Sequence, residues 1–318
     1  MNDSAIEITY VVPLFNEEEV FQTLINRLNG FSQTVKKSHE FLLVDDGSSD
    51  RTGYLMEQLA MSNHKYHAIF LSRNFGHQYA ISAGLKYARG REAVMILDGD
   101  LQDPPEIFQA FYSALQEGYD VVYGVRTKRK ESKLKRIAYY LFYRLLNIIS
   151  STPIFLDSGD FSLISRRVVD IINKMPENSR FIRGMRAWAG FRQKGIPYER
   201  EKRFAGQPKY TFRKLFRLAY DGVFNFSFFP IKFLSASGFF CIGSSIGYFL
   251  ITVFRKYYYD DVPTGFTALL FVTIFFGGIQ LLSIGIIGEY VFRIFQQVKG
   301  RPLFLVKSRI QNGSISYE

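Results

Sequence analysis

The stretch that decides the fold is Ile96-Leu-Asp-Gly-Asp-Leu-Gln-Asp-Pro-Pro-Glu106, in which an apolar run ends in carboxylates and the chain then restarts as a helix. Residues 93–97 predict a buried strand, so Asp98 and Asp100 emerge at its carboxyl end. Open α/β sheets bind their ligands at that end of their strands. The stretch therefore predicts a strand of an α/β sheet and a candidate site together.

Two carboxylates joined by Gly99 can point to the same side of a loop and bind one hard divalent cation. Mg²⁺ or Mn²⁺ held in this way keeps coordination positions open for phosphate oxygens. Gln102 adds a neutral oxygen nearby, and Asp103 is placed to cap the next helix, with Pro104 in its first turn. A solvated Asp-Gly turn is the alternative interpretation of so short a motif.

The chain before this stretch alternates short apolar strands with helix-length segments. Strands are expected at residues 7–13, 41–44 and 68–71, and helices at about 17–30 and 78–88. Alternation of this kind is typical of βαβ units and predicts a mostly parallel sheet.

Polar residues follow each of these three strands, whereas the loops at the opposite ends are ordinary polar connections. Clustering on one side only is not explained by solvation, so it favours a binding site over a solvated turn. The chain contains neither G-x-G-x-x-G nor G-x-x-x-x-G-K-[ST], so a dinucleotide-binding fold and a P-loop are not supported.

Composition limits the class of protein. The 318 residues are 47% hydrophobic and 17% aromatic, which predicts a folded core, and the formal net charge of +11 predicts an anionic partner. Nucleic acid, an acidic membrane surface and a phosphate-bearing substrate all fit that sign. The single cysteine, Cys241, excludes a disulfide framework and indicates a reducing compartment. Residues 1–7 have no apolar segment of the kind found in secretory signals.

The second half begins with a strand expected at residues 121–126. Residues 126–136 then carry seven basic side chains and one acidic, which fits a solvated or membrane-facing surface as well as a site. Residues 137–149 predict an amphipathic helix on lipid headgroups, with a core helix as the alternative. Further strands are expected at 161–165 and 193–198, and helices at 167–175 and 181–189.

Two stretches of 22 residues without charge, 233–254 and 266–287, are long enough to span a bilayer. Glycine and serine recur in both, which predicts close helix–helix approach. Residues 210–228 form a second amphipathic candidate before them. Basic residues cluster before the first span and after the second, so the positive-inside rule places both chain ends in the cytoplasm.

Four ordered motifs resemble family-two glycosyltransferases of the GT-A fold. They are Pro13-Leu-Phe-Asn-Glu-Glu18, Val44-Asp-Asp-Gly-Ser-Ser-Asp50, Ser72-Arg-Asn-Phe-Gly76 and Leu97-Asp-Gly-Asp-Leu-Gln-Asp-Pro-Pro105. More narrowly, the chain is similar to the polyisoprenyl-phosphate sugar transferases, which include dolichyl-phosphate mannose synthases and bacterial undecaprenyl-phosphate glucosyl and aminoarabinosyl transferases. The resemblance covers nearly the whole chain, and four motifs in order are highly specific.

The resemblance implies a role for individual residues. On the donor side, the residues expected around the nucleotide sugar are Pro13, Phe15, Glu17, Asp46, Arg73 and Asp98. The residues implied to hold the metal on its diphosphate are Asp98, Asp100 and Gln102. Asp157 and Ser158 are implied in the acceptor pocket; without the resemblance, this stretch predicts only a loop with a helix cap.

A further segment, Arg203-Phe-Ala-Gly-Gln-Pro-Lys209, resembles the family's mobile R-x-x-G-x-S-K segment. Pro208 stands where the family usually has serine, which puts a hydroxyl contact there in doubt. Arg203 and Lys209 match the pattern and are expected near the acceptor phosphate.

The expected reaction is inverting transfer of a sugar from a nucleoside diphosphate to a polyprenyl phosphate such as undecaprenyl or dolichyl phosphate. Glucose from UDP-glucose is favoured because the resemblance is nearest the bacterial glucosyl group. The acceptor is already an anionic oxygen, so positioning and stabilisation of the leaving diphosphate by Mg²⁺ or Mn²⁺ should dominate. Arg126, Arg136 and Arg203 are candidates to bind the acceptor phosphate, and Asp157 to orient or deprotonate it.

The predicted organisation is a cytoplasmic GT-A domain with juxtamembrane helices (1–228), a two-helix transmembrane region of the cell (inner) membrane (229–295) and a cytoplasmic tail (296–318). The expected partners are the nucleotide sugar, the lipid phosphate and the membrane, without nucleic acid; a homo-oligomer is compatible with the sequence.

Other functions remain open at this stage. GDP-mannose, UDP-GlcNAc and UDP-aminoarabinose derivatives are donors that share the motifs. A processive polysaccharide synthase usually carries Q-x-x-R-W and more spans, whereas the lone Trp188 has no such context. A membrane-tethered nucleic-acid binder predicts a basic stripe with stacked aromatics on the soluble domain, whereas the basic residues here flank the spans.

Overall fold

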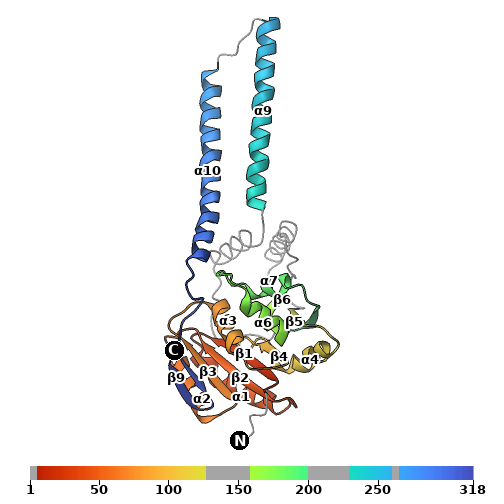
Figure 1. The fold of residues 1–318 in the computed structure, drawn as a ribbon, viewed down its shortest axis with the longest axis vertical. Helices are drawn as coiled ribbons and strands as arrows, with labels where there is room; N and C mark the ends of the chain where they lie inside the picture. The colour runs from red at the N-terminus through yellow and green to blue at the C-terminus, as the bar shows by residue number, and fades with distance from the viewer. Residues whose placement is uncertain (1–5, 127–157, 200–228, 260–264, 318) are drawn as a thin grey trace. The chain divides into compact units, whose positions relative to one another are not determined.

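The computed structural model describes residues 6–126, 158–199, 229–259 and 265–317. These residues form two compact units. One is a β-sheet with helices on both faces, and it includes the described residues after 300. The other holds two long helices, α9 (Phe229–Tyr259) and α10 (Phe266–Val298) (Figure 1).

Four parallel strands form the centre of the sheet in the order β3-β2-β1-β4. Every residue of β1 and β4 is buried, which explains why these strands are mostly apolar in the sequence. The predicted alternation of strands and helices is confirmed. The strands are β1 (Ile8–Leu14), β2 (His39–Asp45), β3 (Tyr66–Leu71) and β4 (Ala93–Ile96), and the connecting helices are α1 (Glu18–Ser32), α2 (Thr52–Ser62) and α3 (His77–Tyr87).

The part of the sheet beyond β4 mixes strand directions. Strand β6 (Ser158–Ser165) runs antiparallel between β4 and β5 (Val121–Arg126), and β7 (Gln193–Tyr198) runs parallel to β5. The start of β6 therefore lies at the same edge of the sheet as the carboxyl ends of β4 and β5. The prediction of parallel strands holds for the centre, and the complete sheet is mixed. The helical elements here are η1 (Pro105–Ile107), α4 (Phe108–Gln116), α6 (Arg166–Lys174) and α7 (Ile182–Trp188).

The end of the chain corrects the sequence prediction. Residues assigned to a tail form β8 (Val306–Gln311), which pairs antiparallel with β3, and β9 (Ser314–Tyr317), which pairs with β8. Asn312 and Gly313 join them with φ of 51° and 72°, the conformation that a tight hairpin turn requires. The sequence analysis did not predict the hairpin because Ile310 is the one fully buried side chain of β8, and its polar neighbours leave the strand without a strong apolar pattern.

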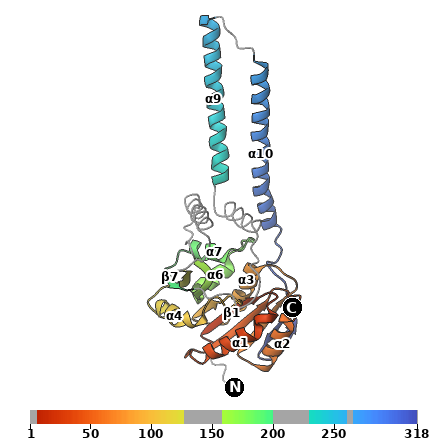
Figure 2. The same ribbon diagram turned by 180° about the vertical axis from the view of Figure 1, so that it is seen from behind.

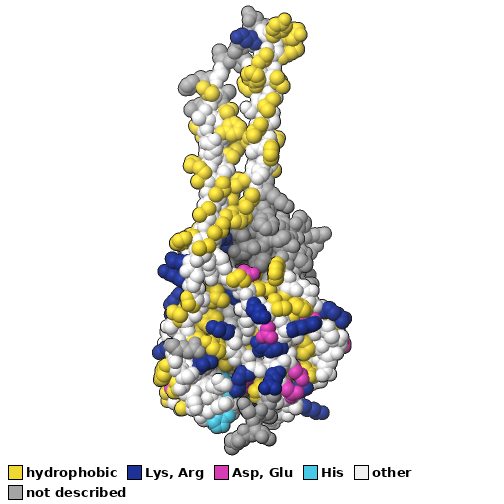
Figure 3. All heavy atoms as spheres, in the orientation of Figure 1, with side chains coloured by type: hydrophobic (Ala, Val, Ile, Leu, Met, Phe, Trp, Pro, Cys, Tyr) yellow, Lys and Arg dark blue, Asp and Glu magenta, His cyan; other side chains and the backbone are white. Residues whose placement is uncertain are grey.

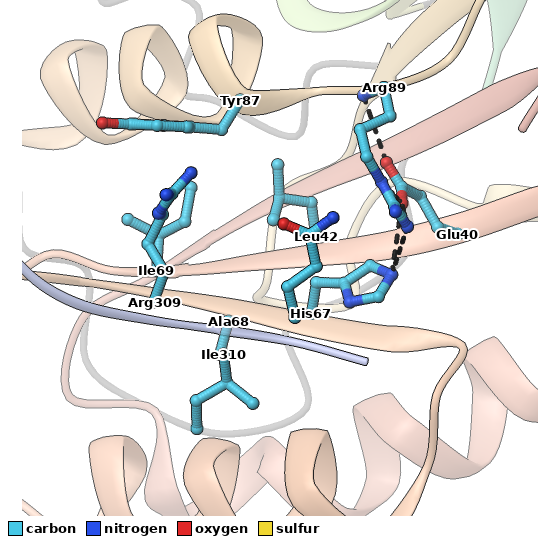
Figure 4. A pocket seen from close by; sticks show the side chains of 10 residues that line it. Glu40, Leu42, His67, Ala68, Ile69, Tyr87, Arg89, Arg309 and Ile310 are labelled. Atoms are coloured by element: carbon cyan, nitrogen blue, oxygen red, sulfur yellow. Dashed lines mark hydrogen bonds and ion pairs between the residues drawn. The ribbon is translucent and has the colours of Figure 1, made fainter. Parts of the chain in front are cut away.

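A charged cluster at the amino ends of the strands holds this hairpin (Figure 4). Glu40 of β2 accepts hydrogen bonds from Thr9 (2.7 Å) and from Arg89, and His67 of β3 lies 3.2 Å from the same carboxylate. Burial favours the neutral carboxyl, but the bonds from His67, Arg89 and Thr9 lower the pKa of Glu40 to about 2. The main-chain N–H of Asn312 donates to Nδ1 of His67 at 3.3 Å. A small cavity lined by this cluster and by β8 lies at the opposite edge from Asp98.

The core has one apolar layer on each face of the sheet. Helices α1, α2 and α4 cover one face, and α3, α6 and α7 cover the other (Figures 1 and 2). The rings of Tyr10, Phe41 and Tyr66 stack across three neighbouring strands, with centroids 5.2 and 5.0 Å apart. Burial of each such side chain contributes about 1.5–3 kcal/mol, so the central strands form a rigid base for the loops at their ends.

Helices α9 and α10 are long and apolar enough to span a membrane over Phe233–Tyr259 and Val272–Val298. Their apolar side chains are exposed along their length (Figure 3). The expectation that glycines permit close helix–helix approach stays a prediction. Among the described residues, a Cβ added at Gly243 or Gly278 would meet no atom within 4 Å.

Candidate active site

The loop after β4 carries Asp98 and Asp100 and lies directly against the exit of β1. A Cβ on Gly99 would come within 2.4 Å of Leu14 Cδ2 and 3.1 Å of the Pro13 carbonyl oxygen, so any larger residue would force the buried Leu14 side chain to shift. Leu101 follows with φ of 59° while its side chain is buried. A left-handed backbone at a branched residue costs about 1–2 kcal/mol and is characteristic of functional loops.

Negative charge is concentrated in this loop, called here the acidic loop (residues 98–103). Burial, followed by the charges of Asp103 and Asp100, raises the pKa of Asp98 to about 7, although His77 opposes the shift. The main-chain N–H of Gln102 donates to the Asp100 carboxylate at 3.2 Å and so stabilises the turn. The described residues contain no group of three His, Cys, Asp or Glu side chains arranged around a metal position. Asp98 and Asp100 as metal ligands stay a prediction, and a cation held by two carboxylates would take its remaining ligands from substrate oxygens.

Asp103 does not cap a helix, contrary to the prediction. The helical turn begins at Pro105 without a side-chain cap, and the Asp103 carboxylate accepts a hydrogen bond from the Tyr198 hydroxyl of β7. A carboxylate that is only 3% exposed needs a buried donor, and Tyr198 supplies one. Arg126 donates from Nε to the same hydroxyl at 3.3 Å. This chain of contacts holds Arg126 at the edge of the sheet where Asp98 lies.

The charge of Arg126 is favoured by its surroundings. Burial opposes the charged guanidinium, but Asp103, the Tyr198 hydroxyl and Asp98 raise the pKa of Arg126. Its Nη2 lies 3.4 Å from the position that a Cβ on Gly159 would take. Arg126 is therefore a fixed cation between the acidic loop and the start of β6.

The loops after β1, β2 and β3 (residues 15–17, 46–51 and 72–76) are joined to one another by hydrogen bonds and close contacts. Because the sequence predicts that they bind the nucleotide sugar, they are called here the donor-side loops. The main-chain N–H of Asn16 donates to Ser48 Oγ (3.0 Å), and the main-chain N–H of Glu17 donates to Thr52 Oγ1 (2.9 Å). Gly47 has φ of 67°, and a Cβ there would lie 2.4 Å from the carbonyl carbon of Arg73. The three polar clusters predicted from the sequence therefore meet at one edge of the sheet.

Asp46 acts within these loops as an acceptor for main-chain amides. Its carboxylate accepts N–H bonds from Phe75 (2.8 Å) and Gly76 (2.9 Å), and it is 3% exposed. Burial raises the pKa of Asp46, and the two amide bonds oppose the shift. The Arg73 guanidinium lies over the Phe75 ring, 4.0 Å from its centroid. Donor contacts of Pro13, Phe15, Glu17, Asp46 and Arg73 remain predictions.

A second charged cluster, which the sequence analysis did not predict, lies on the other side of His77 from the acidic loop. Asp160 of β6 accepts hydrogen bonds from Arg183 Nε (2.9 Å) and Nη2 (3.1 Å) and from Gln78 Nε2 (2.9 Å). His77 Nε2 lies 3.6 Å from both Asp160 and Asp98. Burial favours the neutral acid, but Arg183 and His77 hold the pKa of Asp160 well below its usual range.

Helix α7 supplies two arginines to this cluster. Besides Arg183, the buried Arg186 donates from Nη2 to the Gly159 carbonyl at 3.0 Å. Partial burial opposes a charge on His77, but Asp160 and Asp98 raise the pKa of His77 to about 9. His77 directly follows the Ser72–Gly76 motif and Asp160 lies two residues after Ser158, whereas Arg183 and Arg186 lie near no motif.

Several predicted acceptor residues lie outside the described residues: Asp157, Arg136, Arg203 and Lys209. Both predicted amphipathic segments, 137–149 and 210–228, also lie outside them. Ser158 is the first residue of β6, and its side chain is not described.

Comparison with known proteins supplies the family. The sequence model of the family described as Glycosyl transferase family 2 matches residues 9–172, more than half of the 318 residues. Uncharacterized glycosyltransferase YkcC of Bacillus subtilis (strain 168) is 40% identical over 303 residues, which are 95% of this chain and 94% of that protein. Bactoprenol glucosyl transferase of Shigella phage SfX is 35% identical over 305 residues, covering 96% of this chain and 100% of that protein.

Among solved structures, S. aureus TarS 1-349 in complex with UDP-GlcNAc is similar with a TM-score of 0.43 and 17% identity, covering 69% of this chain and 67% of that chain. The family match and the full-length relatives agree with the acidic loop and the tied loops at one sheet edge. The chain belongs to glycosyltransferase family 2 and is a glycosyltransferase of the GT-A fold.

Proposed function

We propose that this glycosyltransferase moves a hexose, best matched by glucose from UDP-glucose, onto a polyprenyl phosphate with inversion at the anomeric carbon. The observation that carries the proposal is the placement of opposite charges at one sheet edge. The carboxylates Asp98 and Asp100 lie in the loop after β4, and the cation Arg126 lies between them and the start of β6. Similarity to bactoprenol glucosyl transferases along the whole chain supports a lipid-phosphate acceptor.

In the proposed reaction an anionic oxygen of the lipid phosphate attacks the anomeric carbon. The new carbon–oxygen bond forms as the bond to the donor's diphosphate breaks, and the nucleoside diphosphate leaves with that electron pair. A bound Mg²⁺ or Mn²⁺ would neutralise charge on the leaving diphosphate. Asp98 and Asp100, with Gln102 nearby, are the residues that would hold it. A single displacement from the opposite face gives a β-linked product from an α-linked donor.

The protein's own contribution is orientation. The donor-side loops are rigid because Asn16, Asp46 and Gly47 join them, so a nucleotide bound there would meet a preformed surface. Arg126 is proposed to bind the acceptor phosphate, together with Arg136, Arg203, Lys209 and Ser158. Asp157 is proposed to orient the attacking oxygen, which needs little base catalysis because it is already charged.

Chain connectivity supports the proposed membrane topology, in which α9 and α10 span the membrane. The sheet unit precedes α9, and the chain after α10 returns as β8, which pairs with β3 in the same sheet. A chain that crosses twice returns to the side from which it left, so one side must hold both parts of the sheet. The basic residues flanking the spans favour the cytoplasm for that side, where nucleotide sugars are made available.

A donor panel tests the proposed function. Purified chain in detergent is given undecaprenyl phosphate, Mg²⁺ and one labelled nucleotide sugar at a time: UDP-glucose, GDP-mannose, UDP-GlcNAc or a UDP-aminoarabinose derivative. The expected result is label in the lipid fraction with UDP-glucose. Transfer from another donor would change the identity of the sugar and leave the proposed reaction standing. No transfer from any donor, or growth of a long polysaccharide instead, would contradict the proposed reaction.

A further inference from the structure

His77 lies between the acidic loop after β4 and the start of β6. It is the first residue of α3, and its side chain is 48% exposed at the sheet edge. Its Nε2 lies 3.6 Å from Asp98, in the acidic loop, and 3.6 Å from Asp160, two residues after the start of β6. Hydrogen bonds from a ring nitrogen to oxygen measure about 2.7–3.2 Å, so the imidazole is attracted by both carboxylates and can still donate to a third oxygen.

Asp160 is held far more firmly than His77. It is 4% exposed, and Arg183 binds it with two hydrogen bonds while Gln78 adds a third. Gln78 also accepts a bond from the Ile182 amide (2.8 Å), which joins α3 to α7. Breaking such a buried, multiply bonded ion pair is strongly unfavourable, so the Asp160 carboxylate is a fixed reference for the imidazole next to it.

The charges around His77 indicate which kind of group its N–H would bind. A cation bound by Asp98 and Asp100 would reduce the attraction of Asp98 for His77 and would bring phosphate oxygens with it. The N–H donor between the acidic loop and the start of β6 would then face an anion. In the proposed function, both reacting molecules present phosphate oxygens at this point, one from the donor and one from the acceptor.

We propose that Nε2 of His77 donates a hydrogen bond to a phosphate oxygen of the reacting molecules, and that Asp160 is the positioning residue that keeps the imidazole in place. The inference rests on the proposed function and deepens it, because it assigns a phosphate contact to α3. The phosphate belongs to the donor diphosphate or to the lipid acceptor, and these two sources are separable by experiment.

Two variants of His77 separate a hydrogen bond from a structural role. His77→Gln can place an amide N–H near the Nε2 position, whereas His77→Asn places its amide near Nδ1. His64→Gln, at an exposed histidine in the loop between α2 and β3, is the matched control. The measurements are UDP affinity by calorimetry with Mg²⁺, kcat and KM for undecaprenyl phosphate, and the melting temperature.

The expected result is a loss of roughly tenfold to a hundredfold in His77→Asn, partial recovery in His77→Gln and no change in His64→Gln. A loss in UDP affinity assigns the bond to the donor, and a rise in KM for the lipid assigns it to the acceptor; either supports the proposal. The proposal would be overturned if His77→Asn and His77→Gln lost the same amount of affinity or activity together with a lowered melting temperature. It would also be overturned if neither variant lost affinity or activity.

The positioning role has its own test. Gln78→Leu removes one bond to Asp160 without changing its charge, and Asp160→Asn removes the charge. Each should reduce activity in the wild-type background and have much less effect when combined with His77→Asn. Strictly additive losses in both combinations would overturn the role of Asp160, and Gln78→Leu keeps the test usable if Asp160→Asn does not fold.

Failure of the proposed function can be told apart from failure of this inference. Calorimetry with UDP requires neither a lipid acceptor nor sugar transfer. If the wild-type chain glycosylates no polyprenyl phosphate, the proposed function fails, and the comparison of His77→Asn with His77→Gln still measures the bond to the donor. An unchanged UDP affinity in His77→Asn would in that case overturn the inference as well.

Discussion

Replacing Gly47 with alanine should destabilise the donor-side loops and weaken nucleotide binding. The residue has φ of 67°, and an added Cβ would lie 2.4 Å from the Arg73 carbonyl carbon and 2.6 Å from the Asn74 nitrogen. Both neighbours are backbone atoms, so the contact is relieved only by moving the loop after β3 away from the loop after β2. That movement would also strain the bonds from Phe75 and Gly76 to Asp46.

The size of the effect follows from two contributions. A left-handed backbone conformation costs an L-residue about 1–2 kcal/mol, and overpacking against a fixed neighbour costs about 1–3 kcal/mol. Their sum, about 2–5 kcal/mol, corresponds to a decrease in melting temperature on the order of 10 °C for a chain of this size. UDP affinity should fall as well, because the donor-side loops no longer fit together.

Gly30→Ala is the control for this substitution. Gly30 lies in α1, and a Cβ there would meet nothing within 4 Å, so alanine should stabilise the helix by about 0.5–1 kcal/mol. Thermal melting and calorimetry with UDP on both variants are the assays. A melting temperature and UDP affinity of Gly47→Ala equal to those of the wild type would refute the close contact between the two loops.

Three further predictions follow from the same structure. Asp100→Ala should remove most metal-dependent turnover, because an unshielded diphosphate is a poor leaving group; equal turnover with Mg²⁺ and with EDTA in the wild type would contradict this. Arg126→Ala should raise KM for polyprenyl phosphate roughly tenfold to a hundredfold with UDP affinity unchanged, and the exposed Arg192→Ala should change neither; loss of UDP affinity instead would place Arg126 on the donor side. Glu40 has a pKa lowered from 4.5 to about 2, so its stabilisation is complete above pH 4.5 and lost as the pH falls through 2. The melting-temperature gap between wild type and Glu40→Gln should close over that range, and a gap independent of pH would contradict the ion pair.

Much of the fold could be predicted because the signals are local. The central strands are apolar runs bounded by turn residues, and each boundary agrees with the structure to within two residues or so. The placement of Asp98, Asp46 and Arg73 at one edge also follows from the pattern, since the carboxyl ends of parallel strands share an edge.

What could not be predicted depends on long-range pairing. Asp160 meets Arg183 and His77 because β6 runs antiparallel to β4, and nothing near Asp160 in the sequence specifies that direction. Asp103 resembles a helix cap locally, but burial next to Tyr198, 95 residues away, determines its partner. The hairpin of β8 and β9 was detectable in part, because Asn312-Gly313 is a strong turn signal.

The most direct test of the central claim is the structure of the lipid product. Purified chain, undecaprenyl phosphate and labelled UDP-glucose are incubated with Mg²⁺, and the lipid is examined by mass spectrometry and by the proton coupling at the anomeric carbon. The proposed mechanism predicts one hexose linked through the phosphate in the β configuration, and its absence when Asp100→Ala replaces the wild type. An α-linked product, or undiminished product from Asp100→Ala, would contradict it.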